Sequence, residues 1–345
     1  MKLLDLKRPD VRPEALFGVL SCLLLGVFPL TVHDYSAITR FKFLQMILLT
    51  AVCVLCALVF SPSWIPGFAW KTPGRIVGCL YFLLVILSAF FGSYADRIGS
   101  DGTRTVLLGA LRYEGLVTQV CYGLLFLIFS LHAPRREMTV WSVAVSLTVY
   151  VGIVLGQYHG RNVLDLFPTG RSTMSNYEFQ GTLGNIDMVS GYLTLMIPLL
   201  LVPCMLGQCH PFLLFSGLLG VFLEGLMEVQ SGLLAMGVLF AVAGMLFLLK
   251  VSCRRQTLIV MGGMMLTLAL RSMLALPWLD GSESLRLTFS VKAALLLAGA
   301  MVFLLFAAFW PRLRHPVWQR AMPGRRAALL AALILLAALA LIWLL

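Results

Sequence analysis

Residues 157–193 read QYHGRNVLDLFPTGRSTMSNYEFQGTLGNIDMVSGYL and form the longest polar interruption in an otherwise apolar chain. Apolar runs of membrane-spanning length flank it, at 139–156 and 189–207. The same alternation of apolar runs and polar connections continues along the sequence, which predicts an all-α, polytopic integral membrane protein. The composition agrees, because 60% of the 345 residues are hydrophobic and 12% are charged. A soluble domain has no core large enough to bury that much apolar surface.

Eleven apolar runs have roughly the 17–25 residues that a helix needs to cross a bilayer. They lie near 14–32, 42–60, 76–92, 115–131, 139–156, 189–207, 211–229, 231–250, 257–272, 290–310 and 327–345. No polar segment between them is long enough to fold alone, so we expect residues 1–345 to form a single transmembrane domain. Whether the last run spans the bilayer or lies partly in the interface is left open.

Lys and Arg gather in the connections on one side of the predicted helices, and this bias marks the cytoplasmic side. Examples are Lys7, Arg75, Arg135, Arg254 and Arg325. No small-residue cleavage site closes the first apolar run, so the N-terminus is expected inside and, with eleven helices, the C-terminus outside. The net charge of +11 therefore reflects orientation and contact with anionic membrane lipid, and no nucleic-acid partner is expected.

Under this orientation three longer polar segments share the outer face, at 93–114, 157–189 and 271–290. The second contains Gly181-Thr-Leu-Gly184-Asn185, which leads into a helix start expected near Ser190. Glycines allow tight turns and close approach of a ligand to the backbone. The first turn of a helix also offers free N–H groups to an anion. Function is therefore expected at this outer face.

Seven arginines fall in the outer segments: Arg97, Arg104, Arg112, Arg161, Arg171, Arg271 and Arg286. The planar guanidinium binds phosphate through two hydrogen bonds. Two or three such residues can hold a diphosphate and stabilise its departure without a metal. The alternative is that each arginine flanks a helix or pairs with a nearby acid. The sequence has no P-loop, no H-E-x-x-H and no Asp-x-Asp pair in a loop, so neither a metal nor a cofactor is expected.

Several residues are candidates to accept a proton at the outer face. His159 is the one histidine of the long outer segment, and His159, Glu178 and Asp187 are the rival bases. A solvated loop histidine is the simpler interpretation of His159. Glu224 and Glu228 lie one helical turn apart, and Glu224 is expected within the membrane, where an acid is a functional candidate or pairs with an arginine between helices.

Three stretches resemble the bacterial O-antigen ligase and O-antigen polymerase family. The segment Gly181-Thr-Leu-Gly-Asn185-Ile-Asp187-Met-Val-Ser-Gly191-Tyr192-Leu is similar to the family pattern G-x-x-G-N-x-N followed by small residues and a helix start. Arg112-Tyr-Glu114-Gly115-Leu116 resembles its R-x-x-G-L segment. Gln230-Ser231-Gly232-Leu-Leu-Ala235 resembles the start of a later helix. The stretches occur in the family order over about residues 75–250.

The resemblance implies a fold of the lipid-sugar glycosyltransferase (GT-C-like) type in the bacterial cytoplasmic (inner) membrane. Members transfer a glycan from undecaprenyl diphosphate to an acceptor hydroxyl at the outer side of that membrane, in cell-surface polysaccharide assembly. Arginines bind the diphosphate, and neither metal nor nucleotide is required. The implied partners are the undecaprenyl-diphosphate-linked glycan, its acceptor and membrane lipid.

The expected roles follow from the arginines, the acids and the resemblance together. Arg112, Arg161, Arg171 and Arg286 are expected to bind the diphosphate. The pocket is expected to be shaped by Gly181, Gly184, Asn185, Glu114 and Glu228. One of His159, Glu178 and Asp187 would take the proton of the acceptor as the anomeric carbon is displaced in line.

The sequence departs from the family pattern in three places. Asp187 stands where an Asn is usual, and no Arg follows Ser231. The late outer loop, which in the family carries a catalytic His and Arg, is reduced to about 271–290 and contains no His. Two alternatives therefore remain: a non-catalytic subunit that binds lipid-linked glycan, and a membrane transporter or flippase.

Overall fold

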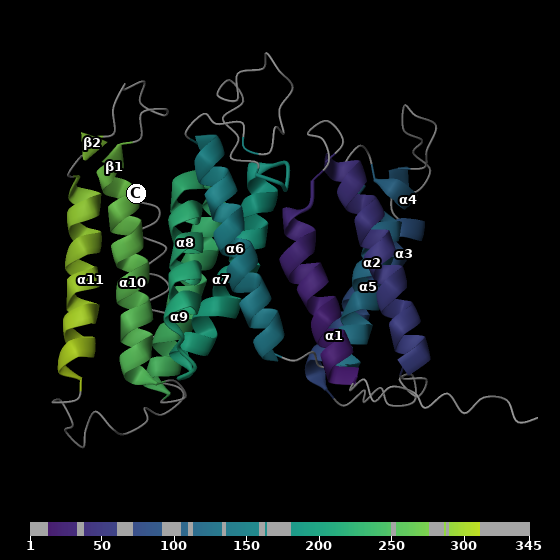
Figure 1. Cartoon of the computed structure of the whole chain (residues 1–345), viewed down its shortest axis with the longest axis horizontal. Helices are drawn as coiled ribbons and strands as arrows, with labels where there is room; N and C mark the ends of the chain where they lie inside the picture. The colour runs from purple at the N-terminus through teal and green to yellow at the C-terminus, as the bar shows by residue number, and fades with distance from the viewer. Residues whose placement is uncertain are drawn as a thin grey trace, which may run out of the picture. The chain divides into compact units, whose positions relative to one another are not determined.

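The computed structural model describes residues 13–32, 38–60, 72–91, 105–109, 113–132, 136–158, 163, 181–249, 253–275, 286–287 and 290–310. These residues form helices, apart from one two-residue antiparallel strand pairing and short connections. The chain divides into two compact units, Met1–Ser142 and Val143–Leu345. Figure 1 shows the helices of both units.

The first unit contains five α-helices and the start of a sixth, with a π-helical and a 3-10 segment after the first. They are α1 (Pro13–Cys22), η1 (Leu23–Val27), η2 (Phe28–Leu30), α2 (Ile38–Phe60), α3 (Pro73–Phe91), α4 (Thr105–Leu108), α5 (Leu116–Leu131) and α6 (Arg136–Tyr158). The helices α2, α3 and α4 each contact α5. Their core is apolar and is formed by Phe17, Leu20, Met46, Cys53, Ala57, Cys121, Leu125 and Ile128.

The second unit contains the rest of α6 and five further helices, with two short strands between the last two helices. They are α7 (Ile186–Met205), α8 (Pro211–Met227), α9 (Gln230–Leu248), α10 (Arg254–Met273), β1 (Leu274–Ala275), β2 (Arg286–Leu287) and α11 (Val291–Phe309). The helix α10 contacts α7, α8, α9 and α11, and α7 also contacts α8 and α9. The connection between α7 and α8 is residues 206–210, and the one between α8 and α9 is residues 228–229 (Figure 1).

Local sequence explains where the helices of the second unit begin. Asn185 precedes α7, and its side chain accepts a hydrogen bond from the backbone N–H of Asp187. His210 does the same for Phe212 at the start of α8, where Pro211 occupies the first helical position. Ser290 accepts from the N–H of Ala293 at the start of α11. Side-chain acceptors satisfy N–H groups that have no partner within the helix.

The multi-pass α-helical prediction is confirmed in its coarse form. Seven helices of the described residues are long and apolar enough to cross a membrane, and three shorter apolar stretches accompany them, at Glu14–Leu30, Leu116–Leu131 and Pro211–Met227. These ten correspond in order to the first ten predicted runs. The eleventh run, 327–345, lies outside the described residues. The total number of spans, the orientation and the GT-C-like type stay predictions.

Two boundaries near the predicted outer segments refine the prediction. The helix α7 begins at Ile186, about one turn before the expected start near Ser190, because Asn185 caps it. The helix α8 ends at Met227, and α9 begins at Gln230. Glu228 between them has a φ of +55°, in the left-handed region that ends a helix. The turn between the seventh and eighth predicted runs thus lies where the sequence places it.

Charged residues avoid the middle of the described helices. In α1 to α11 each Asp, Glu, Lys and Arg lies within about five residues of a helix end. Lys42 is the fifth residue of α2, and Glu224 is the fourth from the end of α8. The described helix interiors are therefore apolar, as expected for segments surrounded by lipid.

Candidate functional site

The glycine-rich segment before α7 forms a tight corner. Gly181 has a φ of +52° and Gly184 a φ of +87°, both in the left-handed region that side chains disfavour. A Cβ at Gly181 would lie 2.6 Å from the hydroxyl oxygen of Tyr150. Gly181 and Thr182 are buried. The corner therefore needs glycine at position 181 for two reasons, its backbone conformation and its close approach to Tyr150.

The end of α6 holds this corner by a hydrogen bond. The backbone N–H of Gly181 donates to Oε1 of Gln157, with a donor–acceptor distance of 2.9 Å. The Gln157 side chain is nearly buried, and its Nε2 has no hydrogen-bond partner among the described residues. Gln157 thus fixes the corner and retains two N–H groups with which a polar ligand or water can bond.

Two tyrosines lie under the corner, between α6 and α7. The rings of Tyr150 and Tyr192 are 5.5 Å apart and meet edge to face, at 63°. Tyr150 is fully buried. The hydroxyls of Tyr192 and Ser146 are buried and have no hydrogen-bond partner among the described residues. The side chains of these tyrosines and Ser146 therefore place hydroxyl groups in the α6–α7 interface, where two purely apolar helices would need none.

A buried acid lies on another side of α7. The Ser190 hydroxyl donates to Oε1 of Glu224 at 2.6 Å, and both side chains are 0% exposed. A Cβ at Gly232 would lie 1.5 Å from this oxygen and 2.4 Å from the Ser190 Oγ. The helices α7, α8 and α9 thus converge at one point. Oε2 of Glu224 has no partner among the described residues.

The sequence left open whether Glu224 pairs with an arginine, and the structure gives it Ser190 instead. The arginine partner belongs to Glu228, whose Oε1 lies 3.4 Å from Nη2 of Arg271. The side chain of Glu228 is 67% exposed and that of Arg271 is 13% exposed. Glu224 and Glu228 are four residues apart, but α8 ends between them at Met227. Glu224 is therefore buried, whereas Glu228 lies at the exposed edge of this region, which we call the rim.

These contacts bring five helix ends together at one end of the second unit. Gln157 and Gly181 join the end of α6 to the start of α7. Ser190, Glu224 and Gly232 join the starts of α7 and α9 to the end of α8. The ion pair between Glu228 and Arg271 joins the ends of α8 and α10. We call this region the polar end of the second unit. It combines hydrogen-bond acceptors, free donors and one arginine, which suits a polar, anionic ligand.

Five of the twelve predicted site residues lie outside the described residues. These are Arg112, His159, Arg161, Arg171 and Glu178. For Arg286 the backbone is described, since it belongs to β2 and pairs with Ala275 of β1. Among the seven arginines of the predicted outer segments, Arg271 is the one whose side chain is described. The roles predicted for Arg112, His159, Arg161, Arg171, Glu178 and Arg286 stay predictions.

Five predicted residues lie at the polar end. Gly181, Gly184 and Asn185 form the corner and the cap of α7, and Asp187 is exposed in the first helical turn. Glu228 lies at its rim. Glu114 belongs to the first unit, where it is exposed just before α5. Its neighbour Tyr113 has a φ of +54° and stacks on Phe43, with ring centroids 5.0 Å apart.

Three members of the polar end were not expected from the sequence: Gln157, Ser190 and Gly232. Gln157 opens the long polar stretch, and Ser190 and Gly232 both lie in stretches that resemble the family. Their residue types gave no indication of a role, because Ser and Gly are also common where helices pack closely in membranes. One sequence feature could have indicated these residues: each is a polar or small residue within about one turn of a helix end.

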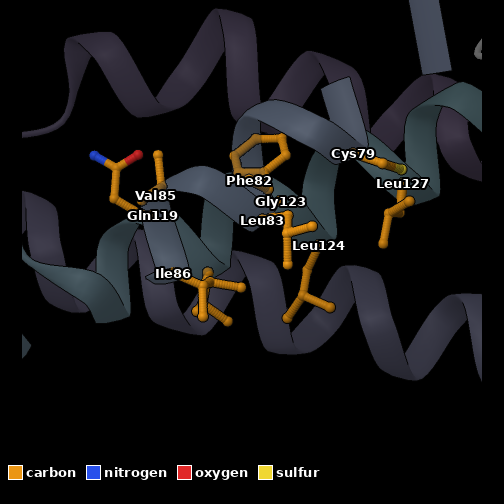
Figure 2. Close-up of a pocket in the computed structure, with 10 residues that line it drawn as sticks. Cys79, Phe82, Leu83, Val85, Ile86, Gln119, Gly123, Leu124 and Leu127 are labelled. Atoms are coloured by element: carbon orange, nitrogen blue, oxygen red, sulfur yellow. The ribbon is translucent and has the colours of Figure 1, made fainter. Parts of the chain in front are cut away.

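The first unit contains an apolar pocket of a different kind. It has a volume of about 300 Å³ and lies between α3 and α5. Figure 2 shows its lining, in which Gln119 is the polar side chain among Cys79, Phe82, Leu83, Val85, Ile86, Gly123, Leu124 and Leu127. None of α3 is buried. Such a surface suits a lipid chain and offers no chemistry for group transfer.

No group of three or more His, Cys, Asp or Glu in the described part of the chain could hold a metal ion. Comparison of the chain with protein-family models, with curated proteins and with solved structures gives no match. The case for a function therefore rests on the residues and their geometry.

Proposed function

We propose that this protein transfers or polymerises an undecaprenyl-diphosphate-linked glycan without a metal ion. The observation that carries the proposal is the position of the Gly181–Asn185 motif. This motif gives the strongest resemblance to the O-antigen ligase and polymerase family, and it forms a buried corner at the polar end of an otherwise apolar helix bundle. A substrate with a lipid tail and a polar head needs such an end, because its head cannot enter the apolar interior.

The proposed chemistry assigns the charged groups to the leaving group. Arg112, Arg161, Arg171 and Arg286 bind the diphosphate, and Arg271 adds a guanidinium at the rim of the polar end. The acceptor oxygen bonds to the anomeric carbon, while the bond from that carbon to the diphosphate oxygen breaks with its electron pair. One of His159, Glu178 and Asp187 takes the acceptor proton. Arginine stabilises the charge on the departing undecaprenyl diphosphate.

The proposed location is the bacterial cytoplasmic membrane, with the polar end at its outer face. Lys and Arg bias along the sequence supports this orientation. The lipid-linked donor, the glycan acceptor and membrane lipid are the proposed partners.

A non-catalytic glycan-binding subunit is the second candidate. Pairing of Leu274 with Leu287 and of Ala275 with Arg286 leaves ten residues, 276–285, to connect the strands. A connection of this length replaces the large late loop of the family. A transporter has less support, since the described helix interiors carry no charge.

Transfer in proteoliposomes tests the proposal. The purified protein is mixed with undecaprenyl-diphosphate oligosaccharide and acceptor in the presence of EDTA, and released undecaprenyl diphosphate is measured. Wild-type protein is expected to turn over, and Arg112→Ala and Arg161→Ala are expected to lose at least about tenfold in rate, as for loss of one charge-assisted contact. Binding of the donor without turnover would instead identify the non-catalytic subunit. Absence of both binding and turnover would contradict both candidates.

A further inference from the structure

Glu224 is a buried acid that the proposed chemistry does not use. It lies one turn inside α8 with an exposed fraction of 0%. An apolar side chain would fill this space without the free-energy cost of removing a carboxyl group from water. Packing alone therefore does not account for an acid at this position, and an ionisable residue within a membrane helix is a candidate for function.

The side chain of Glu224 contacts residues near the starts of α7 and α9. Its Oε1 accepts the Ser190 hydroxyl of α7 at 2.6 Å. The same oxygen lies against the backbone of Gly232, the third residue of α9. Ser190 is the fifth residue of α7, one turn after the cap at Asn185 and the corner that begins at Gly181. Glu224 thus restrains the helix that carries the corner.

Other charged groups on the packed elements have separate partners. Arg271 of α10 contacts Glu228 and donates to the carbonyl of Leu274. The first turn of α9 has no side-chain cap, and the carboxyl group of Glu224 lies beside it. The hydrogen bond from Ser190 to this carboxyl group restrains the start of α7 beside the first turn of α9.

We propose that Glu224 is a positioning residue of the site at the polar end. Through Ser190 it holds the start of α7, and with it the Gly181–Asn185 corner, against the first turn of α9. This inference rests on the proposed function for its effect on transfer, but the restraint on α7 can be measured without any substrate.

The test compares Glu224→Ala, Ser190→Ala and Glu224→Gln with a control on the same helix. Ser216→Ala is the control, because Ser216 is buried in α8 and hydrogen-bonds Thr148 of α6 at 2.8 Å, away from Glu224. Amide hydrogen exchange is measured over residues 186–190 in the purified full-length protein. Glu224→Ala and Ser190→Ala are expected to speed exchange there by about tenfold or more. Glu224→Gln, which keeps the acceptor oxygen, and Ser216→Ala are expected to stay near wild type.

Unchanged exchange over 186–190 in Glu224→Ala and Ser190→Ala would overturn the inference, as would an equal increase in Ser216→Ala. The same variants are then assayed for transfer per folded molecule. A higher KM for the lipid-linked donor in Glu224→Ala and Ser190→Ala, restored by Glu224→Gln, supports positioning of the site. If the wild type transfers nothing, the proposed function fails, while the exchange result still decides the role of Glu224.

Discussion

The backbone N–H of Gly181 donates a 2.9 Å hydrogen bond to the side-chain oxygen of Gln157. The two residues are 24 positions apart, and the intervening chain contains most of the long polar stretch. The bond therefore joins the first residue of that stretch to the start of its glycine-rich segment, at the end of α6. Because the Gly181 N–H is buried, it depends on this partner.

Gln157→Leu is expected to destabilise the corner. The substitution removes the acceptor and leaves the Gly181 N–H buried without a partner, which costs about 1–3 kcal/mol. The measurement is the thermal midpoint of the purified protein in detergent. Gln208→Leu is the matched control, since Gln208 is exposed at the opposite end of α7. Equal midpoints for the two variants would show that the Gln157 contact does not hold the corner.

Gly181→Ala is expected to reduce stability by more than the backbone effect alone. A residue other than glycine in the left-handed region costs about 1–2 kcal/mol, and the new Cβ would also meet Tyr150 at 2.6 Å. Gly191→Ala provides the control on α7, because nothing lies within 4 Å of a Cβ there. Alanine at 191 should stabilise the helix by about 0.5–1 kcal/mol. Stabilisation by both variants would contradict the corner geometry.

The two partners of the rim ion pair are expected to differ in importance. Glu228→Gln should change the free energy of unfolding by at most about 1 kcal/mol, because the glutamate is 67% exposed. Arg271→Ala should cost more, since it also removes the hydrogen bond to Leu274 and the packing of the arginine stem against Gly225. Denaturation of both variants in detergent checks the order. A larger loss of unfolding free energy in Glu228→Gln than in Arg271→Ala would contradict these assignments.

His132 is expected to make the stability of the first unit depend on pH. Its ring stacks on Phe17 at 4.3 Å, and burial lowers its pKa from the usual 6.5. The unfolded chain therefore binds a proton more readily than the folded one, so the stability contribution is complete above pH 6.5 and is lost as the pH falls through the folded pKa. The thermal midpoint between about pH 8 and pH 5 should fall less in His132→Phe than in the wild type. If the thermal midpoints of the two proteins fall equally with pH, His132 does not cause the pH dependence.

Helix positions followed from the sequence because lipid imposes a simple requirement. A helix that crosses a bilayer needs a long apolar run, and such runs are visible without knowledge of neighbours. The run predicted at 115–131 forms α5 at Leu116–Leu131, and the turn after the seventh run ends α8 at Met227. The start of α7 was placed a turn too late, since the cap at Asn185 lies ahead of the apolar run.

The partners of the polar side chains did not follow from the sequence in the same way. Glu224 and Ser190 are 34 positions apart. Their contact depends on which faces α7 and α8 turn toward each other, and Gly232 of α9 leaves room for both side chains. The glycine motif indicated where the corner lies, but it carried no information on Gln157 or Tyr150, which hold and fill its buried side.

Photo-crosslinking tests whether the polar end of the second unit binds lipid-linked glycan. A photoreactive amino acid is introduced in place of Asp187, exposed at the start of α7, or in place of Gln208, exposed beyond its other end. Each protein is irradiated in proteoliposomes with radiolabelled undecaprenyl-diphosphate oligosaccharide. Labelling is expected at position 187, where unlabelled donor suppresses it, and little labelling is expected at 208. Equal labelling at both positions, or none at 187, would contradict binding at the polar end.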